Sequence, residues 1–192
     1  MDQHQGFVLA SSSERRVSLL KQIGFSPEMI VHPDIDESSQ KNEIPKSYSL
    51  RMAISKAQKV ADICPGRFVL SADTVACTGR VILPKTETLE EAKKSLLRIS
   101  GRRHRVYTSL CLILPDSTMR VKSVMTVVQF KRLSISEMKF YLDSNQWVGK
   151  AAGCDIQGLS QAFIKYIRGS YSNVVGLPLH ETYCILSQIF KV

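Results

Sequence analysis

A cluster of three serines, a glutamate and two arginines follows the short apolar run Phe7-Val8-Leu9-Ala10. The run predicts a strand, and one of the serines Ser11-Ser12-Ser13 can cap a helix over about residues 14–23. A helix N-terminus presents free N–H groups and the positive end of the helix dipole, which both suit phosphate. Arg15 and Arg16 are unfavourable in a first turn unless an anion lies there, so these arginines and Ser11 are candidate phosphate ligands. The alternative is a plain helix cap with solvated arginines.

Acidic side chains form a second candidate group. Asp73 follows the buried apolar run Phe68-Val69-Leu70, and we expect that strand to end at Ser71-Ala72-Asp73. A carboxylate at the end of a buried strand can hold Mg²⁺ or activate a water molecule, or it can simply form a turn. Glu37 lies in the acidic loop with Asp36 and can supply a second carboxylate, although a solvated loop explains the local pattern better.

A lysine interrupts an apolar stripe. Met52, Val60 and Ile63 recur at helical spacing, and Lys56 occupies the same stripe. A lysine in this position must either extend its ammonium group to water or meet an anion. Lys56 is therefore a candidate for contact with an anion.

Two loop residues complete the set of candidates. Lys85 follows Ile82-Leu83-Pro84, and simple exposure to solvent is its alternative explanation. Gln157 lies in the run Gly153-Cys154-Asp155-Ile156-Gln157-Gly158. Its amide can donate and accept at once and so can read the edge of a base, but the local pattern favours a hydrogen bond to the loop backbone.

The elements that would position these side chains alternate between strands and helices, with a hairpin in the middle of the chain. This order predicts an α/β fold with a mixed, twisted sheet and helices on both faces. We expect the turn-rich run 169–179 to pack beneath a site rather than to do chemistry. The other expected elements are a strand over Glu28–Val31, a helix over Ser47–Ile63, an extended segment over Val75–Leu83, helices capped by Thr88 and Ser134 that end near Ile99 and Leu142, a hairpin of Val106–Leu114 and Val121–Phe130 turned near Asp116-Ser117, a strand over Ala162–Ile167, and a helix from Pro178 to Phe190.

Length and composition restrict the class of protein. The chain has 192 residues, of which 44% are hydrophobic and 22% charged, so we expect a single domain over residues 1–192. This composition argues against disorder, collagen and coiled coil, and no apolar run is long enough to span a membrane. The segment Met1–Gln5 has no basic patch before an apolar run, which argues against a signal peptide. Five cysteines without paired spacing predict free, buried thiols and a cytoplasmic location, with zinc binding as a weak alternative.

The positive charge is concentrated in one part of the chain. Residues 93–132 hold ten Lys or Arg and a single acid, Asp116, which accounts for the whole net charge of +9. Such a segment favours polyanions, either nucleic acid or phosphorylated small molecules, and a solvated basic surface is the alternative. The chain contains no GxxxxGK[ST], GxGxxG or HExxH motif and no nucleophile elbow, so its phosphate chemistry is not that of a P-loop enzyme.

Several motifs in this order resemble the Maf family of nucleotide pyrophosphatases, over nearly the whole chain. The most specific match is the closing run Gly169-Ser170-Tyr171-Ser172-Asn173-Val174-Val175-Gly176-Leu177-Pro178-Leu179. The other matching stretches are Leu9 to Arg16, Asp36-Glu37-Ser38, Lys56-Ala57, Ser71 to Val75, Glu90-Glu91-Ala92, Ser100-Gly101 with His104 and Thr108, and Ile156-Gln157-Gly158. The chain departs from the usual family pattern at Glu14, at Pro84-Lys85-Thr86 and at Cys154-Asp155.

The resemblance implies a fold related to inosine triphosphate pyrophosphatases and hydrolysis of a nucleoside triphosphate to monophosphate and pyrophosphate with a divalent metal, Mg²⁺ or Mn²⁺. The Ile-Gln-Gly form resembles the branch of the family that acts on dTTP and UTP. Family members are often homodimers, so the same assembly is expected here. By the same resemblance Asp73 is the proton acceptor, Arg16, Thr74 and Gln157 set substrate choice, and Ser11, Arg15, Glu37, Lys56 and Lys85 are further polar site residues.

The mechanism that the resemblance and these residues together imply is attack of water near the α-phosphorus. Asp73 and Glu37 would hold the metal, and Lys56, Lys85 and the two arginines would offset the developing charge. Two other readings stay open. One is a nucleic-acid-binding protein that uses the basic segment 93–132, and the other is a catalytically altered relative that acts in division control.

Overall fold

The computed structural model describes residues 6–190. Within this range the strands form one seven-stranded sheet in the order β2-β1-β3-β5-β6-β7, with β4 paired to β3 off this path. The strands are β1 (Phe7–Ala10), β2 (Met29–Val31), β3 (Phe68–Thr78), β4 (Val81–Leu83), β5 (Arg103–Ile113), β6 (Met119–Phe130) and β7 (Ile164–Arg168).

The sheet is mixed, as the order of elements predicts. Strand β1 runs parallel to both β2 and β3. The remaining pairs are antiparallel, and β5 and β6 form the long hairpin in the middle of the chain. The parallel part ends early, because β1 pairs with β3 only from Phe7–Phe68 to Ala10–Ser71, whereas β3 continues to Thr78.

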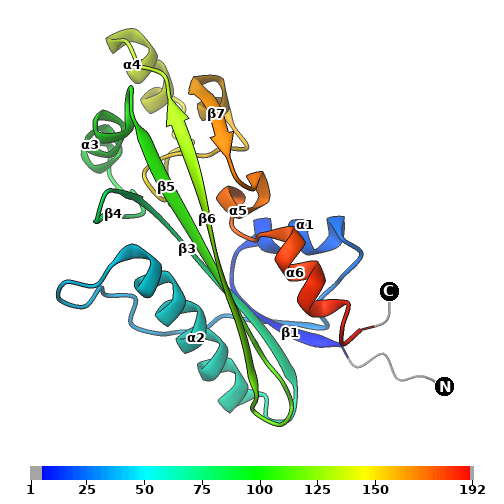
Figure 1. Ribbon diagram of the computed structural model, residues 1–192. Coiled ribbons are helices and arrows are strands. Elements are labelled where there is room, and N and C mark those ends of the chain that lie inside the picture. Colours follow the sequence, from blue (N-terminus) through cyan, green and yellow to red (C-terminus); the bar gives the residue numbers. More distant parts are fainter. Residues whose placement is uncertain (1–5, 191–192) are drawn as a thin grey trace.

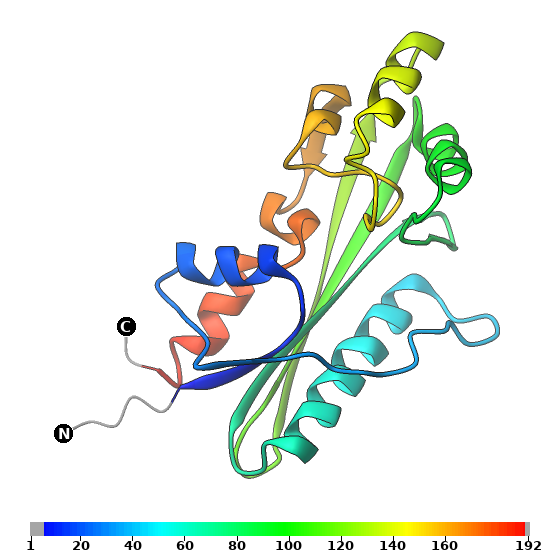
Figure 2. The same cartoon turned by 180° about the vertical axis from the view of Figure 1, so that it is seen from behind.

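Helices cover both faces of the sheet, which confirms the predicted fold class. Helix α2 lies on one face, and α1, α5 and α6 lie on the other (Figures 1 and 2). Helices α3 and α4 lie together at the far end of the β5–β6 hairpin. The helices are α1 (Glu14–Gln22), α2 (Pro45–Ile63), α3 (Leu89–Ile99), α4 (Ile135–Asp143), α5 (Tyr171–Val175) and α6 (Leu179–Leu186), and a 3₁₀ helix spans Leu159–Phe163.

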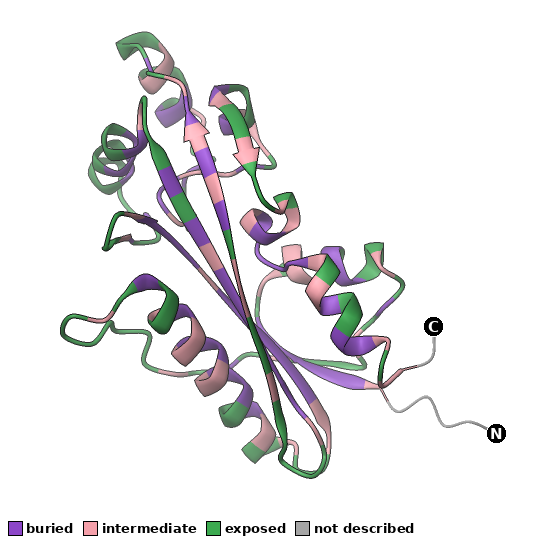
Figure 3. Cartoon of the chain, viewed as in Figure 1, coloured by how far each residue is buried: buried purple, intermediate pink, exposed green. Residues whose placement is uncertain are grey.

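Three buried apolar clusters hold these layers together. One lies between the sheet and α1, α5 and α6 and includes Leu9, Leu20 and Leu70. The second packs α2 onto the opposite face through Ala53, Ala57 and Val60. A third cluster lies under α3 and α4, and the purple segments in Figure 3 show that buried residues run along the strands between all three.

Most element boundaries agree with the expectations from sequence. The capping boxes at Thr88 and Ser134 are both formed. Helix α2 begins two residues early because Pro45 suits a first helical turn. The C-terminal helix ends at Leu186 and does not reach Phe190. The expected strand from Ala162 begins only at Ile164, because a 3₁₀ helix occupies Leu159–Phe163.

Of the helices in residues 6–190, none has the length and apolarity required to cross a membrane. The segment Met1–Gln5, on which the signal-peptide expectation rests, lies outside the described residues. All five cysteines are free, as expected. Cys77 and Cys111 are buried, but Cys184 is exposed, so burial holds for only part of the set.

Candidate active site

Asp73 lies in the middle of a long strand rather than at the end of a short one. The sequence suggested termination because aspartate is unfavourable in strands. Strand β3 continues because β5 pairs with it from Val69 to Cys77, and Asp73 lies opposite Ser109. The carboxylate nevertheless reaches an open edge, since β1 stops pairing with β3 at Ser71. Asp73 is 6% exposed and lines the cleft that this early ending leaves.

Alternation along β3 directs adjacent residues to opposite faces of the sheet. Ser71 and Asp73 point toward α2, where the Ser71 hydroxyl donates to the carbonyl of Ala53. Thr74 points to the other face and contacts α1 through Arg16. Both Asp73 and Thr74 line the same cleft, because the cleft opens where the neighbouring strand is missing.

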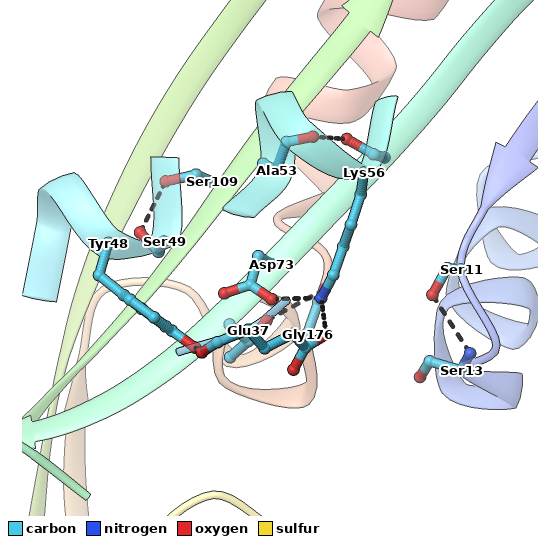
Figure 4. Close-up of polar contacts among 12 residues, drawn as sticks. Ser11, Ser13, Glu37, Tyr48, Ser49, Ala53, Lys56, Asp73, Ser109 and Gly176 are labelled. Carbon is cyan, nitrogen blue, oxygen red and sulfur yellow. Dashed lines mark hydrogen bonds and ion pairs between the residues drawn. The ribbon is translucent and has the colours of Figure 1, made fainter. Parts of the chain in front are cut away.

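Lys56 joins the two candidate carboxylates. Its Nζ lies 2.7 Å from Oδ1 of Asp73 and 2.6 Å from Oε1 of Glu37 (Figure 4). Lys56 is 6% exposed although it lies on the apolar stripe of α2 with Met52 and Val60. Of the two alternatives for this lysine, exposure of the ammonium group to water or contact with an anion, the structure shows contact with two anions.

Glu37 comes from the loop between β2 and α2. Its backbone carbonyl accepts a hydrogen bond of 2.8 Å from the Tyr48 hydroxyl, which fixes the loop against α2. Its other carboxylate oxygen lies 3.4 Å from Nζ of Lys85. Partial burial would raise the pKa of Glu37, but the ammonium groups of Lys56 and Lys85 outweigh this effect and hold the pKa below its ordinary value.

Arg16 organises the opposite wall of the cleft. Its guanidinium group donates to the Gly176 carbonyl at 2.9 Å, to Oγ of Ser11 at 2.9 Å and to Oγ1 of Thr74 at 3.3 Å. Burial lowers the pKa of Arg16, and the charge of Asp73 opposes that effect. Three of its five N–H groups are engaged in these bonds, so two remain for an anion in the cleft.

The entrance to the cleft carries further charges. Arg15 follows the N-terminus of α1, and its Nη1 lies 4.0 Å from Oδ1 of Asp155. The other oxygen of Asp155 lies 2.7 Å from Nζ of Lys150. Asp155 thus pairs with two cations, and both of them line the cleft. The expected helix cap is only partly realised, since Ser13 occupies the N-cap of α1 without a side-chain bond to the helix.

The cleft has a volume of about 400 Å³ and two chemically different ends. One end is polar and contains Glu37, Lys56, Asp73, Lys85 and the serine and arginine cluster before and within α1. The other end is apolar and is lined by Ala76, Val106, Val128, Ile156, Ile164 and Val174, together with His104.

Eight of the nine residues expected in a site are thus placed at or around one cleft, and the ninth is not. Gln157 is exposed and is not among the lining residues, although its neighbour Ile156 is. The backbone N–H of Gln157 donates to Oδ1 of Asp155 at 3.1 Å. Its role in reading a base remains a prediction.

Sequence reasoning gave no role to His104, which lines the apolar end. The signal was present in Arg103-His104-Arg105-Val106, where alternation places the histidine on the same face as Val106. The run 169–179 does pack beneath the site, since Gly176 accepts from Arg16 and Asn173 accepts from Thr108. It forms helix α5 rather than a loop.

Comparison with solved structures identifies the class of fold. Over 95% of this chain and 98% of the other, the structure matches a HAM1 protein from Coxiella burnetii, with a TM-score of 0.52 and 16% sequence identity. At that identity the likeness concerns the fold alone, a mixed α/β sheet with helices on both faces.

The sequence comparison is more specific. The family model of Maf-like proteins matches residues 6–189, so the chain belongs to the Maf family. A protein of Wolbachia pipientis wMel, named dTTP/UTP pyrophosphatase, is 55% identical over 96% of this chain and 93% of its own. A protein of Ehrlichia canis, named nucleoside triphosphate pyrophosphatase, is 53% identical over 96% of each chain.

Proposed function

We propose that this protein is a nucleoside triphosphate pyrophosphatase, a hydrolase that cleaves the bond between the α- and β-phosphates of dTTP or UTP, or of a modified nucleotide. The products are the nucleoside monophosphate and pyrophosphate. The observation that carries the proposal is the pairing of Lys56 with Asp73 and Glu37 at the polar end of a cleft whose opposite wall holds Arg16. The names of the relatives at 53–55% identity support both the reaction and the pyrimidine substrates.

The polar end offers the charges that a triphosphate needs. Arg16 and the N-terminus of α1 are on one wall, and Lys56 and Lys85 are on the other. Four cationic side chains, with Arg15 at the entrance, can offset the charge that develops on phosphate oxygens during cleavage. Loss of one such group would cost on the order of 10²–10³ in rate.

Asp73 has the position expected of a proton acceptor. One carboxylate oxygen, Oδ1, is held by Lys56 at 2.7 Å. Among residues 6–190 the other oxygen has no hydrogen-bond partner, so it is free to accept a proton from a water molecule in the cleft. Lys56 orients the carboxylate and keeps it from turning away from the substrate.

A divalent metal fits the donor set only together with the substrate. Residues 6–190 contain no group of three or more His, Cys, Asp or Glu side chains that could hold a metal by themselves. Glu37 and Asp73 meet at one ammonium group, and Mg²⁺ is commonly held by one or two carboxylates plus substrate phosphates. These two residues would hold Mg²⁺ or Mn²⁺, and the ion would supply positive charge at the phosphates.

Substrate choice is assigned by the same proposal to Thr74 and Gln157, in addition to Arg16. Thr74 is hydrogen-bonded to Arg16 and to Thr108, whose hydroxyl lies 2.9 Å away. A contact between Thr74 and the nucleotide would therefore position the nucleotide relative to both walls of the cleft. The free cysteines are compatible with a cytoplasmic protein, which is the proposed location. A homodimer remains part of the proposal by analogy with the family.

The test is a panel of nucleoside triphosphates with Mg²⁺ or Mn²⁺, scored for pyrophosphate and monophosphate. We expect dTTP and UTP to be the best substrates. Asp73→Asn should abolish pyrophosphate release while the thermal unfolding curve stays close to that of the wild type. Orthophosphate as the product, or unchanged turnover in the variant, would contradict the proposal.

The nucleic-acid alternative has less support, because the basic segment is divided in space. Lys93, Lys94 and Arg98 lie on α3, whereas Arg120 and Lys122 lie near the turn of the hairpin. Arg103 and Arg105 share one hollow of the sheet with Arg168, Tyr166 and His104, which gives the alternative a group of cations beside an aromatic ring. Salt-sensitive binding of a single-stranded oligonucleotide would test it. The altered-relative alternative, action in division control, predicts no turnover in the nucleotide panel.

A further inference from the structure

His104 is a buried histidine with an unsatisfied ring nitrogen. The residue is 4% exposed, and its Nδ1 has no hydrogen-bond partner. Within residues 6–190 only two other buried side-chain atoms share this condition, Oδ1 of Asn173 and Oε2 of Glu181. Buried polar groups nearly always have a partner, because an unsatisfied group loses its bonds to water without replacement. Because His104 also lines the cleft, a bound ligand can supply the partner that its imidazole ring lacks.

Within the cleft, the surroundings of His104 offer no ionic partner, although the residue also borders the hollow of Arg103, Arg105 and Arg168. The other lining residues at this end of the cleft are apolar, including Val106 on the same strand, Val128 opposite on β6, and Ile164. The ring of Phe130 lies 5.7 Å away, centroid to centroid. Burial lowers the pKa of His104 to about 4, so the imidazole is neutral near pH 7. A neutral ring in an apolar wall suits an uncharged, planar, partly polar group.

The two ends of the cleft give a bound molecule a direction. The cations and carboxylates gather around Asp73, and the apolar wall lies farther along the same strands, where Ala76 pairs with Val106 and His104 pairs with Val128. A volume of about 400 Å³ is within the usual range for small-molecule sites, roughly 300–1,000 Å³. A nucleotide matches this division, since its phosphates are charged and its base is flat and largely apolar.

We propose that His104 binds the base of the nucleotide, through a hydrogen bond between its imidazole ring and the edge of a uracil or thymine. This inference rests on the proposed function and names the part of the substrate that the apolar end receives. A neutral imidazole has one donor and one acceptor nitrogen. The edge of uracil or thymine has carbonyl groups beside an N–H, so either tautomer of His104 finds a complementary group. The methyl group of thymine would lie against the valine and isoleucine side chains.

The inference separates base binding from the exposed Gln157. If His104 reads the base from inside the cleft, then Gln157 affects the ranking of nucleotides less than His104 does. The role is one of specificity and binding, because His104 lies at the opposite end of the cleft from Asp73 and Lys56.

The test compares His104→Leu with the wild type under steady-state conditions. We expect KM for dTTP and UTP to rise about 10- to 100-fold, because one buried hydrogen bond to the base is lost, with kcat changed by less than about threefold. Inhibition by dTMP should weaken by a similar factor, whereas inhibition by pyrophosphate, which has no base, should not change.

Stability provides a readout that a merely structural histidine would not reproduce. Replacement of an unsatisfied buried polar group by an apolar one removes a cost, so Tm of His104→Leu should equal or exceed that of the wild type. Thr182→Val is the matched control. Thr182 is also buried, but its hydroxyl donates to the Pro178 carbonyl at 2.8 Å on α6, away from the cleft. We expect this control to lower Tm by a few degrees, roughly, and to leave KM unchanged.

The outcomes distinguish the two proposals. If the wild type hydrolyses no nucleoside triphosphate, the proposed function fails. If the wild type is active but His104→Leu keeps the wild-type KM for dTTP and affinity for dTMP, the base-binding role of His104 is wrong and the proposed function stands. A variant that loses Tm and weakens pyrophosphate and dTMP inhibition equally would also overturn the inference, because it would indicate a structural histidine.

Discussion

Replacement of Lys56 by methionine should destabilise the fold and abolish most of the activity. Lys56 is 6% exposed, and its ammonium group lies between two carboxylates at 2.6 and 2.7 Å. Methionine keeps most of the packing on α2 but leaves Asp73 without its cation and leaves Glu37 with Lys85 alone, at 3.4 Å. Breaking a buried ion pair in this way costs about 3–5 kcal/mol. The lower value, about 3 kcal/mol, applies here because the Glu37 side chain is 40% exposed and water screens its share.

For a chain of 192 residues, about 3 kcal/mol corresponds to a fall in Tm of roughly 6–12 °C. Thermal unfolding at pH 7, followed by circular dichroism, measures it. Lys59→Met is the matched control, because Lys59 lies on the same helix but is exposed, and it should change Tm by less than about 2 °C. The double variant Lys56→Met/Asp73→Asn should lose about 1–2 kcal/mol less stability than the two single variants lose together, because the neutral amide no longer needs a cation.

Two results would refute this reasoning. One is a fall in Tm no larger than that of the Lys59→Met control, and the other is strict additivity in the double variant. The metal proposal gains a separate readout from the same proteins. If Mg²⁺ binds between Glu37 and Asp73, it should raise Tm of Lys56→Met more than Tm of the wild type, because the ion replaces the missing ammonium group.

Three further outcomes are expected. Arg16→Lys keeps the charge but cannot form the three bonds of the guanidinium group, so KM for dTTP should rise about tenfold in steady-state assays; an unchanged KM would exclude Arg16 from the phosphate site. Asp155→Asn releases Arg15 and Lys150 from a carboxylate, so KM should fall about two- to fivefold, and a rise would show that the carboxylate assists binding. The folded-state pKa of His104 is lowered from 6.5 to about 4, so the unfolded chain takes up a proton in this interval while the folded chain does not. Stability should therefore fall by about 2 kcal/mol from pH 7 to pH 5, and chemical denaturation of His104→Leu should show a correspondingly smaller loss over the same range.

The sequence allowed most of the fold to be predicted because its local signals were unambiguous. Both capping boxes were visible as Thr or Ser followed three residues later by Glu, and both are formed. The hairpin was marked by two β-branched runs around Asp116-Ser117. Where prediction was wrong, a tertiary contact decided the outcome. Strand β3 continues through Asp73 because β5 supplies a partner, and no local pattern around an aspartate can show that.

The site divides along the same line. Lys56 could be singled out because a charged residue on an apolar stripe needs an explanation, and the contact with Asp73 supplies it. That Glu37 is the second partner could not be derived locally, since its loop looks like any acidic, solvated loop. Arg16 was notable only for its place in a first helical turn. Its bonds to Thr74 and Gly176 join segments 58 and 160 residues apart along the chain, so the local spacing of residues could not predict them.

The early ending of β1 beside the long β3 has a mechanical consequence. Before Ser71, strand β3 lies in the part of the sheet that is covered by helices on both faces. After Ser71, the same strand enters the separate apolar cluster under α3 and α4. Asp73 lies near this change of surroundings, on the one strand that both parts of the sheet share. If the two ends of the sheet move when a ligand binds, residues in the walls of the cleft are displaced more than the Asp73 carboxylate. Opening and closing of the cleft would then change the contacts between its walls and the ligand, while the Asp73 carboxylate stays in position.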